Sequence, residues 1–160
     1  MEDFYPDIER AIKKKYKNLE NPEYFFLSNE EEKENYDGLL DFFRAQGFVV
    51  FDDTDFNVDV SLHCRLCKTE ETYILRLSFI GRFAVLAKID ADQILLIDGA
   101  ETSDRLASEI LDVLKKFGVR CLSEEMISRS YPISLIDLEE GGATIFNALF
   151  STDNYRGQVK

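Results

Sequence analysis

Residues that build most catalytic and metal sites are scarce in this sequence. It has one histidine, His63, and three cysteines, Cys64, Cys67 and Cys121. An odd number of scattered cysteines does not make a disulfide framework, and free thiols fit a reducing compartment. The sequence also has no G-x-G-x-x-G, phosphate-loop or G-x-S-x-G motif. Nucleotide-binding and serine-hydrolase chemistry therefore lack their usual signatures.

Long apolar segments are also missing. No run approaches the roughly 20 residues that span a bilayer. In the N-terminal segment MEDFYPDIERAIKKK the charges follow the apolar residues rather than precede them. That is not the order of a signal peptide. We therefore expect a cytoplasmic protein without a membrane partner.

Basic residues are outnumbered by acidic ones. Lys and Arg total 19 against 31 Asp and Glu, which gives a formal net charge of -12 and a sequence pI near 4.5. Because phosphate recognition depends on Lys and Arg, this balance argues against direct binding of nucleic acid and favours a basic partner. The alternative is an acidic surface that serves solubility alone.

The acidic residues are concentrated between Ser28 and Asp59. This stretch has ten acidic residues and two basic ones, so it supplies about two thirds of the net charge. A glutamate-rich helix start followed by a solvated loop would explain such a stretch. The functional alternative is an electrostatic face that attracts and covers a basic protein.

Apolar residues are nevertheless abundant enough for a core. The 160 residues are 45% hydrophobic and 12% aromatic, which predicts a single domain over 1–160. Helical spacing and end signals predict three helices. The first runs from Pro6 to Leu19, the second from Ser28 or Asn29 to Gly47, and the third from a cap at Thr102 or Ser103 to Gly118.

Period-two patterns and short apolar runs predict the strands. These cover 48–51, 56–67, 73–89 with a turn or bulge at Gly81, 93–97 and, after a Gly-Gly turn, 144–150. A helical turn is expected at 123–127. We therefore predict an α+β fold, with an antiparallel sheet of four to six strands packed by about three helices.

The run His63-Cys64-x-x-Cys67 resembles a ligand cluster, but its alternation argues otherwise. Residues three apart on a strand point to opposite faces, so Cys64 is predicted in the core, and His63 and Cys67 outside it. A zinc site would need a second pair of ligands, and a thioredoxin-like pair would open a helix. We predict neither a metal nor a redox cofactor.

The spacing Asp53-x-Asp55-x-Asn57-x-Asp59 is that of carboxylates in a calcium loop. An EF-hand also needs Gly at its sixth position and Glu at its twelfth, where this sequence has Val58 and Cys64. The row is therefore predicted to face outward from a strand whose inward residues are Phe56, Val58 and Val60. Divalent-ion binding in another geometry stays open, and with it an alternative function as a metal-dependent hydrolase that uses Asp53, Asp55, Asp59 and His63.

The C-terminal third carries a family resemblance. The run ASEILDVLKKFGVRCLSEEMISRSYPISLIDLEEGGATIFNALFSTD resembles the ending of immunity proteins found beside Rhs-type, contact-dependent and related bacterial polymorphic toxins. In these endings a helix, a Leu-Ser-Glu-Glu segment and an ATIFNALFSTD ending follow in that order. The resemblance implies a protein that binds a cognate toxin domain in the producing cell and blocks it.

The sequence thus predicts an immunity protein rather than an enzyme, with an acidic adaptor module as a further alternative. It would neutralise a basic toxin domain by stoichiometric occlusion, and a nuclease is the natural toxin class because nucleases carry basic grooves. The residues expected to contact the toxin are Glu30, Glu31, Glu34, Asp52, Asp53, Asp55 and Asp59. Nearby aromatic residues that could anchor the contact are Tyr24, Phe25, Phe26 and Tyr36.

Overall fold

The centre of the molecule is a mainly antiparallel sheet. The computed structural model describes residues 4–24, 31–98, 102–135, 138–139 and 141–153, and within them the sheet has six strands in the order β1-β2-β3-β4-β5, with β6 paired to β4. The strands are β1 (Val49–Asp52), β2 (Ser61–Lys68), β3 (Glu71–Ser78), β4 (Phe83–Asp90), β5 (Gln93–Leu96) and β6 (Arg120–Cys121). Only the β4–β6 pairing is parallel.

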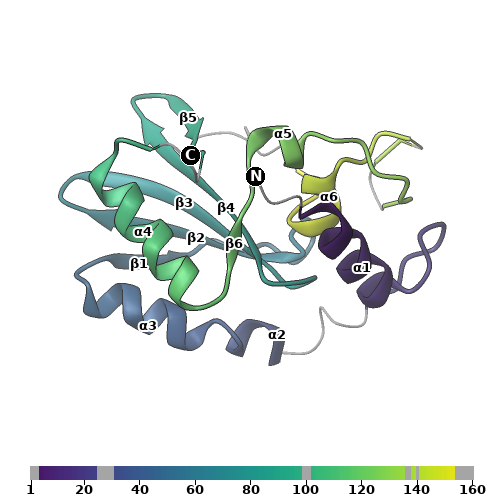
Figure 1. The fold of residues 1–160 in the computed structure, drawn as a ribbon, viewed down its shortest axis with the longest axis horizontal. Helices are drawn as coiled ribbons and strands as arrows, with labels where there is room; N and C mark the ends of the chain where they lie inside the picture. Colours follow the sequence, from purple (N-terminus) through teal and green to yellow (C-terminus); the bar gives the residue numbers. More distant parts are fainter. Residues whose placement is uncertain (1–3, 25–30, 99–101, 136–137, 140, 154–160) are drawn as a thin grey trace.

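Two of the longer helices cover one face of this sheet. The helices are α1 (Tyr5–Tyr16), α2 (Glu31–Glu34), α3 (Asp37–Ala45), α4 (Arg105–Lys116), α5 (Glu124–Ile127) and α6 (Ile145–Leu149). Figure 1 shows α4 running across the strands, with α3 below it. The buried residues of α3 and α4 form one core cluster with Leu62, Leu75 and Leu86 of the strands. The predicted α+β fold is confirmed.

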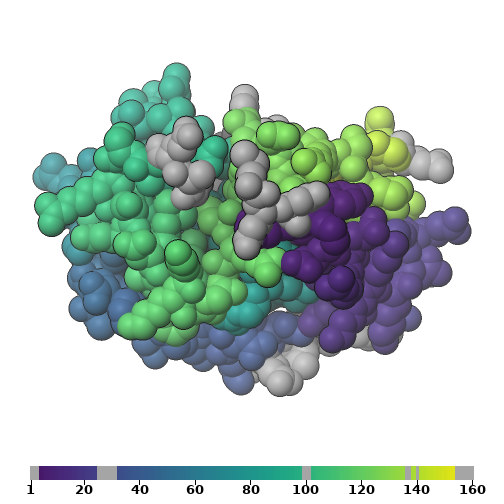
Figure 2. Space-filling view, viewed as in Figure 1, coloured from purple at the N-terminus to yellow at the C-terminus, as the bar shows by residue number. Residues whose placement is uncertain are grey.

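A second core cluster lies at the other end of the sheet. It joins α1, α5 and α6 with Val60 and Val85. Figure 2 shows the purple N-terminal segment beside the green and yellow C-terminal third. The buried hydroxyl of Tyr16 donates a hydrogen bond of 2.6 Å to the carbonyl of Ala148, which ties the two ends of the chain together.

Most predicted helices are confirmed, with differences at their ends. Asp104 rather than Thr102 or Ser103 caps α4, because its carboxylate accepts a hydrogen bond from Ala107 N–H at 3.1 Å. Gly118 follows α4 with a φ of +71°, the conformation expected of a helix stop. The expected helical turn at 123–127 is present as α5, capped by Ser123.

The second predicted helix is two helices instead of one. A turn at Asn35 and Tyr36 separates α2 from α3. Tyr36 is buried, and its hydroxyl donates to the carbonyl of Ser78 at 2.6 Å. This contact to the end of β3 is long-range in sequence, so helical spacing alone does not reveal the break. It also shows that Tyr36 points into the core, as its helical spacing predicts, and is not available as a surface anchor.

The predicted final strand at 144–150 is wrong, because these residues form the short helix α6. Thr144 caps it by accepting from Asn147 N–H, and the Asn147 side chain accepts from Thr144 N–H. This reciprocal capping box fixes a helical start. Both apolar faces of the segment are buried, so its composition resembles that of a buried strand.

The strand predicted over 56–67 begins later than expected, at Ser61. Residues 53–60 form a loop, and Phe56, predicted to face inward, is 48% exposed. From Ser61 onward the prediction is confirmed, because Leu62, Cys64 and Leu66 are buried while His63, Arg65 and Cys67 lie on the opposite face. Gly81 lies between β3 and β4 as expected of a turn.

Within the part of the chain that the structure describes, no helix is both long and apolar enough to cross a membrane.

Candidate functional site

The candidate site is the acidic loop between β1 and β2, together with the strand residues that hold it. Asp52, Asp53 and Asp55 are exposed, as predicted. Asp59 is only 2% exposed, so its predicted outward orientation is wrong. Glu34 is exposed on α2. Glu30 and the side chain of Glu31 lie outside the described residues.

The spacing of the carboxylates is explained by turn chemistry. The Asp52 side chain accepts a hydrogen bond from Thr54 N–H at 3.0 Å, and the Asp55 side chain accepts from Asn57 N–H at 3.0 Å. Both bonds join residue i to the backbone of residue i+2, which is the pattern of an Asx turn. In the calcium-like row, Asp55 and Asp59 therefore bind backbone N–H groups of the loop, and Asp53 pairs with Arg65.

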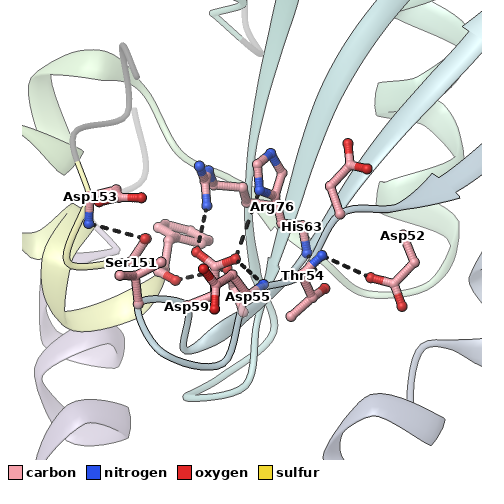
Figure 3. A network of polar contacts seen from close by, with 12 residues as sticks. Asp52, Thr54, Asp55, Asp59, His63, Arg76, Ser151 and Asp153 are labelled. Atoms are coloured by element: carbon pink, nitrogen blue, oxygen red, sulfur yellow. Dashed lines mark hydrogen bonds and ion pairs between the residues drawn. The ribbon is translucent and has the colours of Figure 1, made fainter. Parts of the chain in front are cut away.

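Asp59 anchors the loop from beneath, as Figure 3 shows. Its carboxylate accepts a hydrogen bond from Arg76 on β3 at 3.1 Å and another from Asp55 N–H at 2.9 Å. Arg76 is 8% exposed, and its guanidinium lies 5.5 Å from the ring centroid of Phe146. Burial lowers the pKa of Arg76, although the Asp59 charge opposes this effect. The pair is a buried salt bridge, so the removal of either side chain would leave the other charge buried without a partner.

The C-terminal segment completes this anchor. Asp59 forms an antiparallel bridge with Ser151. Val60 N–H donates to the carbonyl of Phe150 at 2.8 Å, and Thr152 N–H donates to the carbonyl of Val58 at 2.9 Å. Residues 150–152 therefore fix the base of the acidic loop.

His63 lies beside the buried pair on β2, directly opposite Arg76 in the strand register. Its side chain is 22% exposed, and its Nδ1 atom lies 3.8 Å from Oδ2 of Asp59. Burial is the main reason that the pKa of His63 lies below its ordinary value of 6.5. The positive charges of Arg76 and Arg65 lower this pKa further, while Asp59 and Asp53 act in the opposite direction.

We expect His63 to titrate below pH 6.5, which can be followed by NMR because it is the only histidine of the chain. The unfolded chain takes up this proton at a higher pH than the folded chain. The neutral imidazole therefore contributes its full stability at a pH above the pKa that His63 has in the unfolded chain. This contribution is lost as the pH falls through the pKa that His63 has in the folded chain. Urea unfolding between about pH 7 and 5 should show this loss, and His63→Gln should remove it. A titration midpoint at or above 6.5 would contradict the prediction.

The exposed aspartates also have cationic neighbours. Asp53 pairs with Arg65 and Asp52 with Lys33. Burial acts to raise the pKa of Asp52, but hydrogen bonds from Lys33 and Thr54 outweigh it and hold this pKa below its ordinary value. Among the described residues, no three His, Cys, Asp or Glu side chains are grouped to hold a metal ion. The set Asp53, Asp55, Asp59 and His63 is thus not assembled as a metal centre in this structure.

The three cysteines are free, as predicted. Burial raises the pKa of the Cys64 and Cys121 thiols to about 12. Cys67 lies on the opposite face of β2 from Cys64 and is partly exposed, with its Sγ atom 3.7 Å from Oγ1 of Thr72. Cys64 and Cys67 therefore cannot share one ligand without a change of strand register.

Exposed apolar side chains flank the acidic loop, and the sequence interpretation missed them. Val49 and Phe51 on β1 are 55% and 42% exposed, and Phe56 in the loop is 48% exposed. The run FVVF was predicted as a buried strand. The helices α3 and α4 pack on the side of β1 that carries Val50, however, so Val49 and Phe51 on the other side belong to neither core cluster. Of the candidate aromatic anchors, Tyr24 packs edge-on against Tyr16. Phe25 and Phe26 lie outside the described residues.

Comparison of this chain with protein-family models, with curated proteins and with solved structures found no match.

Proposed function

We propose that this protein is an immunity protein, which binds a basic toxin domain through its acidic loop and blocks it without chemistry. One observation carries the proposal. Three of the four large hydrophobic side chains most exposed among the described residues lie in the acidic loop or on the strand that leads into it. Val49 and Phe51 are on β1, which ends at Asp52, and Phe56 is in the loop. Apolar anchors surrounded by charge are typical of protein interfaces, where charge guides association and buried anchors provide affinity.

The geometry of the loop supports binding rather than catalysis. Its carboxylates cap turns or pair with arginine and lysine, and the Asp59–Arg76 salt bridge fixes its base. A loop fixed in this way needs little ordering when a partner binds, so less entropy is lost on association. The resemblance of residues 107–153 to immunity proteins supports the same function, since this segment contacts the loop through Phe150, Ser151 and Thr152.

The gene immediately upstream tests the proposal, because we expect it to end in a toxin domain that can be co-expressed with this chain. We expect the two chains to co-purify in a 1:1 ratio and the host cells to survive, whereas cells that express the toxin domain alone should die. Absence of binding by the wild-type chain, or death of cells that express both chains, would overturn the proposed function.

A further inference from the structure

The sheet has a second apolar face, opposite to the one that α3 and α4 cover. Strand pairing places two rows of side chains on it. We call these rows the open sheet face. The first row is Val49, Cys67, Thr72, Ile89 and Ile94, and the second is Phe51, Arg65, Ile74, Ala87 and Leu96.

The open sheet face is unusual because it is both apolar and accessible. An antiparallel sheet that has helices on one side normally presents polar residues on the other. Here Arg65 is the only ionic member, and it is paired with Asp53 and lies 4.5 Å from the Phe51 ring centroid. All members except Ala87 are partly or largely exposed.

Neither core cluster covers most of this face. The cluster of α1, α5 and α6 reaches only its margin, where Leu96 packs against it. Ile74, Ile89 and Ile94 are partly exposed and belong to neither cluster. An apolar surface of this kind, outside the core and bordered by charge, marks a site for a partner.

Carboxylates border the open sheet face on two sides. Asp53 and Asp55 follow β1 at one margin. Glu70 lies in the β2–β3 turn, and Asp90 and Asp92 lie at the β4–β5 turn, all three exposed at the same end of the sheet. A complementary partner has an apolar centre surrounded by Lys and Arg.

A second copy of this chain does not fit the same surface. From the usual strand spacing and rise, two rows across five strands cover on the order of 300 Å², whereas a stable dimer buries about 800 Å² on each partner. A symmetric contact that extended beyond the face would bring the surrounding carboxylates of the two copies together. Such like-charge contacts oppose association.

We propose that the open sheet face is the centre of the toxin-binding surface, and that the acidic loop is its margin. The occupant is an apolar patch of the toxin domain bordered by basic residues. This inference rests on the proposed function, and it identifies the surface that provides the binding affinity. Ile74, Ile89 and Ile94 supply the buried contact, and Asp53 and Asp55 supply the charge.

Cys67 tests the proposal without any substitution, because it lies in the first row of the open sheet face. Cys64 and Cys121 serve as internal references, since burial raises their thiol pKa to about 12 and makes them slow to react. N-ethylmaleimide should modify Cys67 first in the free chain. In the complex with the upstream-encoded toxin domain, we expect modification of Cys67 to slow by about tenfold or more.

Matched variants test the same face by affinity. Ile89→Arg and Ile74→Arg place a charge at partly exposed positions of the face, and Leu95→Arg places the same charge on the other side of β5, where Leu95 is 43% exposed. We expect the two isoleucine variants to weaken toxin binding by about thirtyfold or more, and Leu95→Arg to bind like the wild type. Circular dichroism checks that each variant is folded.

The outcomes separate this inference from the proposed function. If the wild-type chain binds the toxin domain but Cys67 stays reactive and the isoleucine variants bind normally, the open sheet face is not the interface and only this inference falls. If the wild-type chain does not bind, both fall. If the free chain is a dimer that Ile89→Arg dissociates, the occupant is a second copy and the inference is overturned.

Discussion

Replacement of Asp59 by alanine is expected to lower the free energy of unfolding by about 3–5 kcal/mol, because it leaves the buried Arg76 charge without its partner. The change also removes the acceptor for Asp55 N–H. Since domains of this size are stable by about 5–15 kcal/mol, the loss is a large fraction of the total. Urea unfolding measured by circular dichroism gives the difference.

Asp55→Ala is the matched control for this prediction. It removes an aspartate from the same loop, but an exposed one whose carboxylate accepts a hydrogen bond from Asn57 N–H rather than pairing with a buried charge. Its expected cost is about 1 kcal/mol or less. Equal effects of Asp55→Ala and Asp59→Ala would show that the loop is held in some other way.

A double-mutant cycle with Arg76→Met isolates the salt bridge. Each single change leaves one buried charge unpaired, whereas the double change removes both. The double variant should therefore be less destabilised than the sum of the two single variants. Loss of Arg76 should also raise the pKa of His63, because the Arg76 charge is one of the causes that lower it. If the effects of Asp59→Ala and Arg76→Met on the free energy of unfolding were strictly additive, the two side chains would not be paired.

The sheet could be predicted from the sequence where its pattern is local. The alternation from Leu62 to Cys67 predicts which side of β2 is buried, because a period of two is set by the strand itself. The same reasoning shows that Cys64 and Cys67 do not form one site, which the structure confirms. The α4 helix was equally clear because its apolar stripe is long and a glycine ends it.

Elements that depend on distant contacts could not be predicted. The alternation of residues 56–60 continues that of β2, yet these residues form a loop because Asx turns shape it and residues 150–152 pair with its end. Asp59 was therefore assigned to the surface although it is buried. Residues 144–150 are predicted as a strand although 145–149 form a helix, because periodicity does not distinguish a short buried helix from a short buried strand.

The accessible apolar surface of the sheet could not be predicted from the sequence for a related reason. The continuous apolar run at 48–51 predicts a buried strand, yet Val49 and Phe51 are exposed. Whether a second layer covers both faces depends on where the helices pack, and here α3 and α4 pack on the same side. The candidate binding surface thus arises from tertiary arrangement rather than from any motif.

Charge reversal at Glu34 and Asp55 is expected to slow association with the toxin domain by about tenfold or more at low salt. Asp55 is exposed in the acidic loop, and Glu34 is exposed on α2, whose Lys33 pairs with Asp52 at the start of that loop. The variant Glu34→Lys/Asp55→Lys changes the net charge by four units. The control Glu20→Lys/Asp112→Lys changes it equally at two exposed positions elsewhere, one after α1 and one on α4.

Stopped-flow measurements over a series of salt concentrations distinguish a local effect from a general one. If the acidic loop guides the encounter, the first variant associates more slowly than the control and its rate depends less on salt, because fewer attractive charges remain to be screened. Dissociation should change little, since in the proposed complex the apolar contacts at Ile74, Ile89 and Ile94 govern it. Identical association rates for the two variants would mean that the total charge, rather than the acidic loop, attracts the partner.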